Sequence, residues 1–103
     1  MAIPDQLPAE LFETLVKKNS LHIERIVSRG HTTPAGKWYD QDWDEWVLLL
    51  QGDAVIEYES DLPDAVLSAG DYLMFPAHLK HRVAWTDNKK DTIWLAVHFP
   101  QTD

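Results

Sequence analysis

The chain has 103 residues, enough for one domain with a single hydrophobic core and too few for two. Its formal net charge of -8 and its nine scattered basic residues argue against a phosphate-backbone partner, so we expect no nucleic acid. The absence of cysteine excludes disulfides and thiolate metal sites, which leaves His, Asp, Glu, Gln and Tyr as candidate metal ligands.

The sequence contains no signal for membrane targeting. Its N-terminal residues lack a basic stretch followed by an apolar run, so no signal peptide is expected. No apolar run approaches the length needed to cross a bilayer. We therefore expect a cytoplasmic protein with no membrane partner.

Residues 7–19 carry the pattern of an amphipathic helix. A proline lies where the first turn would be, and a lysine pair lies where the last turn would be. Leu11 and Leu15 are spaced to form an apolar stripe. We expect residues 1–20 to form an N-terminal helical extension that packs on the rest of the domain.

The rest of the chain is a series of short apolar runs separated by Gly, Pro and Asp turn signals. Strands are expected at residues 21–27, 46–50, 54–59, 65–67, 72–75, 81–85 and 92–99. Turn signals at this spacing are typical of an all-β sandwich or barrel rather than of alternating strands and helices. Residues 21–100 are therefore predicted to form a single all-β barrel domain.

Alternation along these strands predicts which residues share a face. It places Glu45 on one face with Val47, and His81 on one face with Val83 and Trp85. A carboxylate or imidazole that begins such an apolar face lies at one end of a buried surface. An unpaired carboxylate there is costly, so Glu45 is expected to meet a cation or strong hydrogen-bond donors.

Two motifs in this part of the chain resemble those of the cupin superfamily. Glu45 and Gly52, with six residues between them, match the end of the first cupin motif. Gly70, Pro76 and His81 fall in the matching slots of the second. Together the motifs and the span between them cover about half the chain. The resemblance implies a cupin-type double-stranded β-helix, which is a jelly-roll barrel, with the one predicted N-terminal helix added.

The chain departs from the family pattern around the metal-ligand positions. Metal-binding cupins carry His-any-His three or four residues before the Glu, and those slots here hold Tyr39 and Gln41, or Trp38 and Asp40. A Gly slot of the second motif is His78, and its Asn slot is Trp85. Two of the four family ligand positions, Glu45 and His81, keep a residue of the expected kind.

These residues still offer a set of metal ligands. Gln41, Glu45 and His81 supply an amide oxygen, a carboxylate and an imidazole, and His78 can join from the loop. Such a set suits Zn, Fe, Mn or Ni and leaves coordination positions open. Tyr39 is a candidate acid or base at the rim. In the alternative, Glu45 and His81 pair with each other and line a pocket without metal.

Aromatic residues and one further histidine are candidates for the pocket wall: Trp38, Trp43, Trp85 and His98. On the central strand, Trp46, Leu48 and Leu50 form a second apolar face. One helix is too little to cover that face, so we expect a homodimer joined through sheet faces.

Two functions follow from this reading. In the first, the protein is a metal-dependent enzyme acting on a small molecule, and the resemblance implies dioxygenase, isomerase or decarboxylase chemistry among others. In the second, it is a non-catalytic binding or sensing protein for a small molecule, with or without metal. The sequence holds no nucleotide loop and no nucleophile elbow that would favour another class.

Overall fold

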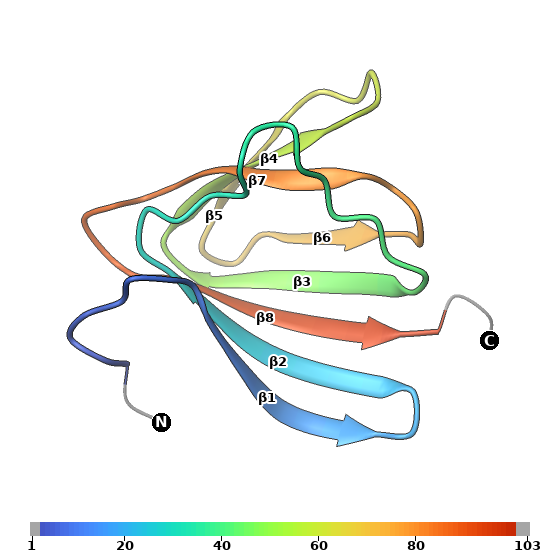
Figure 1. Ribbon diagram of the computed structural model, residues 1–103, viewed down its shortest axis with the longest axis horizontal. Helices are drawn as coiled ribbons and strands as arrows, with labels where there is room; N and C mark the ends of the chain where they lie inside the picture. Colours follow the sequence, from blue (N-terminus) through green and yellow to red (C-terminus); the bar gives the residue numbers. More distant parts are fainter. Residues whose placement is uncertain (1–2, 101–103) are drawn as a thin grey trace.

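The computed structural model describes residues 3–100, which form eight β-strands in two sheets (Figure 1). The strands are β1 (Leu11–Lys18), β2 (Leu21–Ser28), β3 (Asp44–Gln51), β4 (Asp53–Tyr58), β5 (Ala65–Ser68), β6 (Tyr72–Phe75), β7 (His81–Thr86) and β8 (Thr92–Phe99). The seven strands predicted from residue 21 onward are confirmed, each within two residues at either end.

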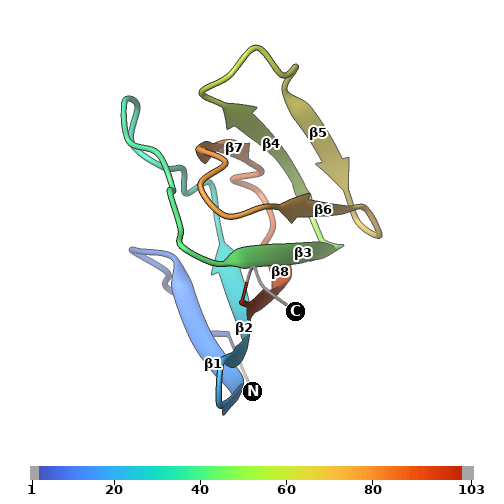
Figure 2. The ribbon, with the colours of Figure 1, turned by 90° about the vertical axis from the view of Figure 1, so that its right-hand side faces the viewer.

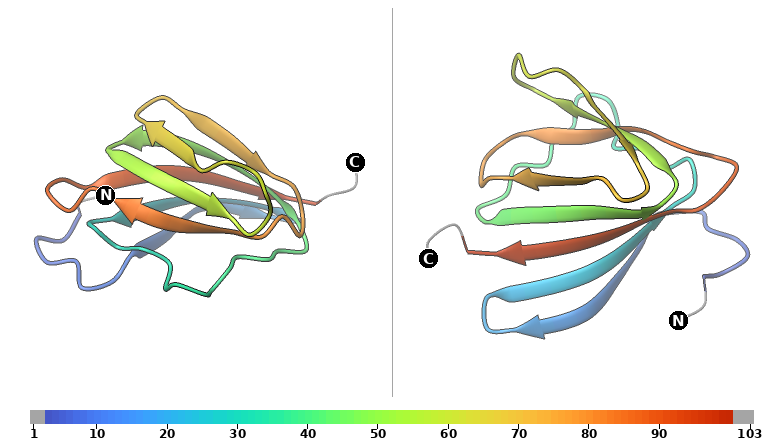
Figure 3. Two further views of the ribbon diagram at one scale, coloured as in Figure 1. Left: turned by 90° about the horizontal axis from the view of Figure 1, so that it is seen from above. Right: turned by 180° about the vertical axis from the view of Figure 1, so that it is seen from behind.

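The two sheets differ in size and enclose the core between them. The larger sheet has the order β1-β2-β8-β3-β6, and the smaller has the order β5-β4-β7. All strand pairs in both sheets are antiparallel. Figure 2 shows β4 and β5 standing apart from the larger sheet, and Figure 3 shows the strands of that sheet side by side.

The core forms because alternate residues of the paired strands point between the sheets. The fully or nearly fully buried members are Val47, Leu49, Ala54, Ile56, Leu67, Phe75, Trp94 and Ala96. Every second residue from Glu45 to Leu49 is buried, as is every second residue from Thr92 to His98. Glu45 thus begins an inward face that continues with Val47 and Leu49, and His98 ends one that contains Trp94 and Ala96.

The predicted N-terminal helix is wrong. Residues Leu11–Lys18 are strand β1, which pairs with β2 through a two-residue turn at Asn19 and forms the edge of the larger sheet. The helical spacing of Leu11 and Leu15 was misleading, because a bulge between Thr14 and Val16 interrupts the alternation of the strand. Pairing with β2 outweighs the weak local helix preference of this segment. The N-terminal segment is therefore part of the larger sheet.

A hydrogen-bonded closure of the two sheets into a barrel is also not seen within residues 3–100. β1 and β6 are the edges of the larger sheet, and β5 and β7 are the edges of the smaller one. The chain passes from one sheet to the other through tight turns, as at Gly52 between β3 and β4. The layers are therefore joined by the chain at these corners instead of by a continuous ladder of hydrogen bonds.

Gly52 is needed at its corner for two reasons. Its backbone has φ of 89°, in the left-handed region that favours glycine. A Cβ atom there would lie 2.5 Å from Thr92 Oγ1 and 2.8 Å from Thr92 Cα. The close approach of β8 to this turn holds the last strand against β3.

In the described part of the chain, no helix is long and apolar enough to span a membrane.

Candidate functional site

A cavity of about 90 Å³ lies between the sheets, next to the polar ends of β3 and β8. Polar residues from six segments line it: Glu10, Glu24, Tyr39, Gln41, Glu45, His81 and His98. A wider groove of about 630 Å³ outside the cavity shares Glu24, Gln41 and His98 with it and is also lined by Trp43. The cavity therefore opens to the surface on the side where Trp43 lies.

The site is assembled by the register of the larger sheet. Glu45 on β3 lies opposite Phe75 on β6 and opposite His98 on β8. His98 in turn lies opposite His22 on β2. Residues directly opposite each other in antiparallel strands hold their side chains on the same face and close together. One row across four strands therefore places a carboxylate between two aromatic rings.

Glu45 is buried, with 7% of its surface exposed. Burial raises the pKa of its carboxyl group, against the opposing effects of His98 and of a hydrogen bond with Gln41. Its Oε1 lies 3.9 Å from His81 Nε2, and its Oε2 lies 3.8 Å from His98 Nε2. Both separations are longer than a hydrogen bond, so neither histidine is hydrogen-bonded to Glu45.

His81 is held in one tautomer by the backbone. Its Nδ1 lies 2.8 Å from the carbonyl oxygen of Leu79, which can only accept a hydrogen bond, so Nδ1 carries the proton. Burial lowers the pKa of His81, which keeps the ring neutral. The Phe75 ring stacks on it with centroids 3.7 Å apart and fixes its plane. The Nε2 lone pair is therefore free and faces Glu45 in the cavity.

His98 is held in the opposite tautomer. The indole Nε1–H of Trp43 donates to His98 Nδ1 at 2.8 Å, and an indole nitrogen can only donate. His98 Nδ1 is therefore unprotonated, and its Nε2–H donates to Glu24 Oε1 at 2.9 Å. With Nδ1 accepting and Nε2 donating, the ring is in a neutral tautomer, and burial is the largest influence on the pKa of Glu45.

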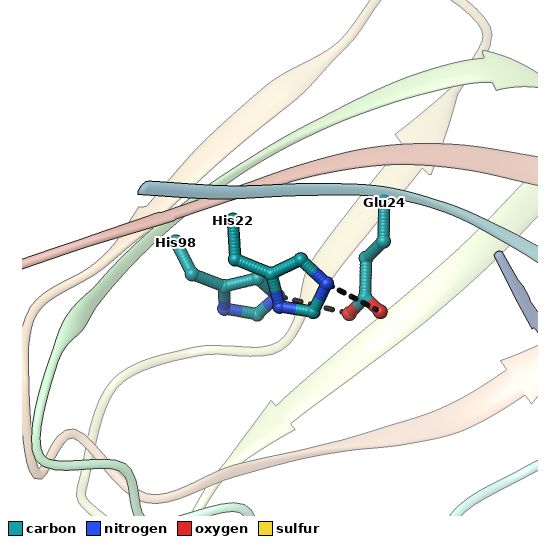
Figure 4. A group of neighbouring side chains, drawn as sticks. All are labelled: His22, Glu24 and His98. Carbon is teal, nitrogen blue, oxygen red and sulfur yellow. Dashed lines mark hydrogen bonds and ion pairs between the residues drawn. The ribbon is translucent and has the colours of Figure 1, made fainter. Parts of the chain in front are cut away.

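His22, Glu24 and His98 bring one ligand-type atom each to within 4.8 Å of one another, and Figure 4 shows both imidazoles beside the carboxylate. His22 Nε2 lies 4.0 Å from Glu24 Oε2 and 3.0 Å from Thr14 Oγ1. A metal at this cluster would need the Nε2 of His98, which carries a proton while Trp43 is bonded to Nδ1. In the conformation observed, the cluster is a hydrogen-bonded network and not a set of free ligands.

Tyr39 and Gln41 lie at the cavity, as the sequence analysis expected of residues in the family's ligand slots. Tyr39 pairs with His81 through backbone hydrogen bonds, and its ring stacks on the His81 ring with centroids 5.6 Å apart. Burial, followed by the nearby Glu10, raises the pKa of Tyr39, so its hydroxyl stays protonated at neutral pH. Gln41 lines both the cavity and the outer groove.

His78 does not reach the cavity. It is exposed, its Nδ1 lies 2.8 Å from Asp40 Oδ1, and its Nε2 lies 3.5 Å from Asp42 Oδ1. Its backbone has φ of 65°, the left-handed conformation that favours glycine. This explains why the cupin motif has Gly in the slot that His78 occupies here. The slot is set by the path of the chain, and its side chain points away from Glu45 and His81.

The expected tryptophan wall is only partly present. Trp43 lies in the outer groove, while Trp38 is half-buried and is not among the residues that line the cavity. Trp85 is 48% exposed, because a bulge between Val83 and Trp85 in the pairing of β7 with β4 turns it to the outside. The aromatic residues that do line the cavity are Phe12, Tyr39, Phe75 and Trp94.

The sequence analysis missed two acidic residues of the cavity, Glu10 and Glu24. Glu10 accepts a hydrogen bond from Ser28 Oγ at 2.7 Å. Glu24 could have been found by alternation, since it shares a strand face with His22 and with the inward-facing Ile26. Glu10 could not, because it precedes a segment that was predicted to be helical.

Two motifs, the antiparallel strands and the polar site between the sheets define a cupin. The family model for the Cupin domain matches residues 27–98, well over half the chain, and the protein belongs to the cupin family. No curated protein matches the chain.

Among solved structures, the chain is similar to a candidate mannose-6-phosphate isomerase of Ralstonia eutropha JMP134. The two are 48% identical with a TM-score of 0.91, over 95% of this chain and 91% of that one. A cupin superfamily protein of Desulfitobacterium hafniense DCB-2 is 23% identical with a TM-score of 0.76, over 95% and 84%. The enzyme Fe(II)-HppE with the alternative substrate (S)-1-HPP is 16% identical with a TM-score of 0.73, over 95% and 53%. The last two likenesses concern the fold alone.

Proposed function

We propose that this cupin binds a divalent transition metal in the cavity through Glu45, His81 and Gln41, and holds a small molecule beside it. The observation that carries the proposal is the Nε2 of the buried His81, which faces the buried carboxylate of Glu45 at 3.9 Å, beyond hydrogen-bond distance. Histidines that bind metals are commonly fixed in this way, with the second nitrogen donating to a carbonyl oxygen. Carboxylate, imidazole and amide ligands suit Zn, Fe, Mn or Ni.

His78, expected at this site from the sequence, has no place in the proposed ligand set. His98 is also left out, because Trp43 holds its proton on the nitrogen that faces the cavity. Three protein ligands leave further positions for a substrate or for water.

A metal-dependent enzyme acting on a small molecule is the function that this arrangement favours. When bound, the metal supplies a Lewis acid that polarises an oxygen of the substrate. Tyr39 would serve as the proton donor, because its hydroxyl is protonated at neutral pH and its ring lies against His81 at the rim. The isomerase and Fe(II) names in the comparisons belong to those proteins and support this class of activity.

A non-catalytic binding or sensing protein is the second candidate. One observation favours it: Tyr39 and Gln41 stand in slots where metal-binding cupins carry histidines, so the ligand set is weaker than the family's. Under this proposal the cavity would bind its small molecule with or without metal.

Metal content tests the proposal, with a matched control in the same segment. After loading with Zn²⁺ and removal of the excess, His81→Ala and Glu45→Ala should each retain less than one tenth of the wild-type metal. The control His78→Ala removes an exposed histidine three residues away and should retain all of it. Equal zinc in wild type and His81→Ala would refute the site, and folding of each variant is checked by circular dichroism.

The homodimer expected from the sequence also stays a proposal. One row across the outer face of the larger sheet consists of Val16, Ile23, Val97, Trp46 and Met74. No helix covers this face in residues 3–100, and a second copy would bury the row. Light scattering should show a dimer that Trp46→Glu converts to a monomer. A wild-type monomer at high protein concentration would contradict the proposal.

A further inference from the structure

The charge of the cavity restricts what it can bind. Three carboxylates, Glu10, Glu24 and Glu45, line a space of about 90 Å³. Among the described residues that line the cavity or its outer groove, none is lysine or arginine. His81 and His98, the two histidines of the cavity, are in neutral tautomers, since Leu79 and Trp43 fix one tautomer of each ring, and a third histidine, His22, lines the outer groove. The described wall therefore offers no lysine or arginine to an anionic ligand.

The basic residues near the cavity in sequence are directed elsewhere. Arg25, next to Glu24, lies on the opposite face of the sheet and pairs with Glu13. Lys17 pairs with His22 in register but is exposed at the edge of the sheet. Arg82, next to His81, bonds to Glu57 at 2.8 Å and to the Thr33 carbonyl oxygen. None of these three residues lines the cavity or its outer groove.

The acidic groups are distributed over two ends of the cavity. Glu45 and His81 face each other at one end, where the proposed metal would lie. Glu24 lies at the same end, since its Oε1 accepts the Nε2–H of His98 at 2.9 Å and Glu45 Oε2 lies 3.8 Å from the same nitrogen. Glu10 lies at the other end, where it accepts a hydrogen bond from Ser28, four residues farther along β2 than Glu24. A divalent ion neutralises two of the three negative charges, so the loaded cavity still has a net negative charge.

The remaining wall is apolar and includes four aromatic residues, Phe12, Tyr39, Phe75 and Trp94, beside the aliphatic residues Ile26, Val47, Ile56 and Val83. Aromatic faces attract organic cations, and most strongly where water is excluded. His81, only 4% exposed, also directs a nitrogen without a hydrogen bond into the same space, which indicates that the cavity is built for a ligand. Carboxylates and aromatic rings together form the recognition chemistry of an ammonium group.

We infer that the organic ligand of this cavity is a small ammonium compound, which places its positive charge against Glu24 and its oxygen toward Glu45 and His81. The inference deepens the proposed function and rests on it only for the position of the oxygen. It also separates this chain from phosphosugar chemistry. A phosphate dianion would enter a space lined by no lysine or arginine, and the net charge of the three carboxylates stays negative even with a divalent metal bound.

Binding of matched probes tests the inference. Calorimetry at pH 8 on Zn²⁺-loaded and on metal-free protein would compare choline with its neutral isostere 3,3-dimethylbutan-1-ol, and 3-aminopropan-1-ol with butan-1-ol. Mannose 6-phosphate would be compared with mannose. We expect at least one cation to bind ten or more times tighter than its neutral partner, and mannose 6-phosphate to bind no tighter than mannose.

A variant pair locates the preference. Glu24→Gln should reduce the ratio of cation to neutral affinity at least fivefold while the zinc content stays unchanged, because Glu24 is not among the proposed metal ligands. The control Glu59→Gln removes an exposed carboxylate outside the cavity and should leave the ratio unchanged. Ratios below tenfold in both probe pairs, or a preference for the phosphate, would overturn the inference. Loss of zinc binding with the cation preference intact would overturn only the proposed metal site.

Discussion

Glu45→Gln should make the metal-free protein more stable, although it removes a proposed metal ligand. In the folded protein burial raises the pKa of Glu45 above its usual value of 4.5. A group with a raised folded pKa contributes stability below its unfolded pKa and loses it as the pH rises through the folded value. At pH 8 wild type therefore carries the penalty of a buried charge, which the neutral and similarly shaped Gln avoids.

The size of the effect follows from the burial of the side chain. With 7% of Glu45 exposed, the penalty that Gln removes is about 1–2 kcal/mol, in the range found for buried polar groups that lack full compensation. A domain of this size gains about 4–8 °C in melting temperature per kcal/mol. Glu45→Gln should therefore melt about 5–15 °C higher than wild type in EDTA at pH 8, and the difference should vanish near pH 4.5.

With zinc bound, wild type should become more stable than Glu45→Gln. Zinc at a hundredfold excess over its Kd stabilises a protein by about 2.7 kcal/mol, which only wild type can gain. Thermal unfolding is measured under four conditions, at pH 5 and at pH 8, each with EDTA or with zinc. The control Glu59→Gln should change the free energy of unfolding by less than about 0.5 kcal/mol. The reasoning is refuted if Glu45→Gln is less stable than wild type in EDTA at pH 8, or if zinc stabilises both proteins equally.

Three further predictions concern the corner glycine and the two histidines. Gly52→Ala should lower the free energy of unfolding, measured in urea, by more than about 2 kcal/mol, because backbone strain and the contact with Thr92 add. The control Gly36→Ala, with φ of 82° and no atom within 4 Å of the new Cβ, should lower it by about half as much. Equal losses in the two variants would contradict the close contact. The imidazole NMR signal of His81, identified by its absence in His81→Ala, should titrate only below pH 6.5, because burial lowers the pKa of this ring. The stability that the neutral ring contributes should be present above pH 6.5 and be lost as the pH falls through the folded pKa. A titration midpoint above pH 6.5 would contradict this. Nitrogen-15 spectra should show His98 protonated at Nε2 in wild type and in mixed tautomers in Trp43→Phe, and a wild-type proton on Nδ1 would refute the assigned hydrogen bond.

The strand pattern and the two motifs were readable from sequence because they depend on local alternation and on turn residues. Alternation placed Glu45 inward correctly, since β3 has no bulge between Glu45 and Leu49. Alternation failed for Trp85 because β7 has one extra residue, which reverses the face of the sheet to which the following side chain points. A bulge depends on how two strands pair, and no residue type at this position predicts one.

The N-terminal strand failed for a different reason. Leu11 and Leu15 are four residues apart, a spacing that fits a helix as well as a strand. The strand β1 forms because β2 pairs with it. Once residues Leu11–Lys18 were predicted to be helical, Glu10 and Phe12 could not be assigned to the cavity. The acidic and aromatic side of the site was therefore lost together with one secondary-structure element.

The two cavity histidines show why residue type alone could not identify the ligands. His81 and His98 are both buried, both neutral and both within 4 Å of Glu45. They differ in one partner each: a carbonyl oxygen accepts from Nδ1 of His81, while the Trp43 indole donates to Nδ1 of His98. One ring therefore presents a lone pair to the cavity and the other presents a proton. The metal is proposed beside the first ring, and the hydrogen-bonded Glu24 beside the second is left for a cationic ligand.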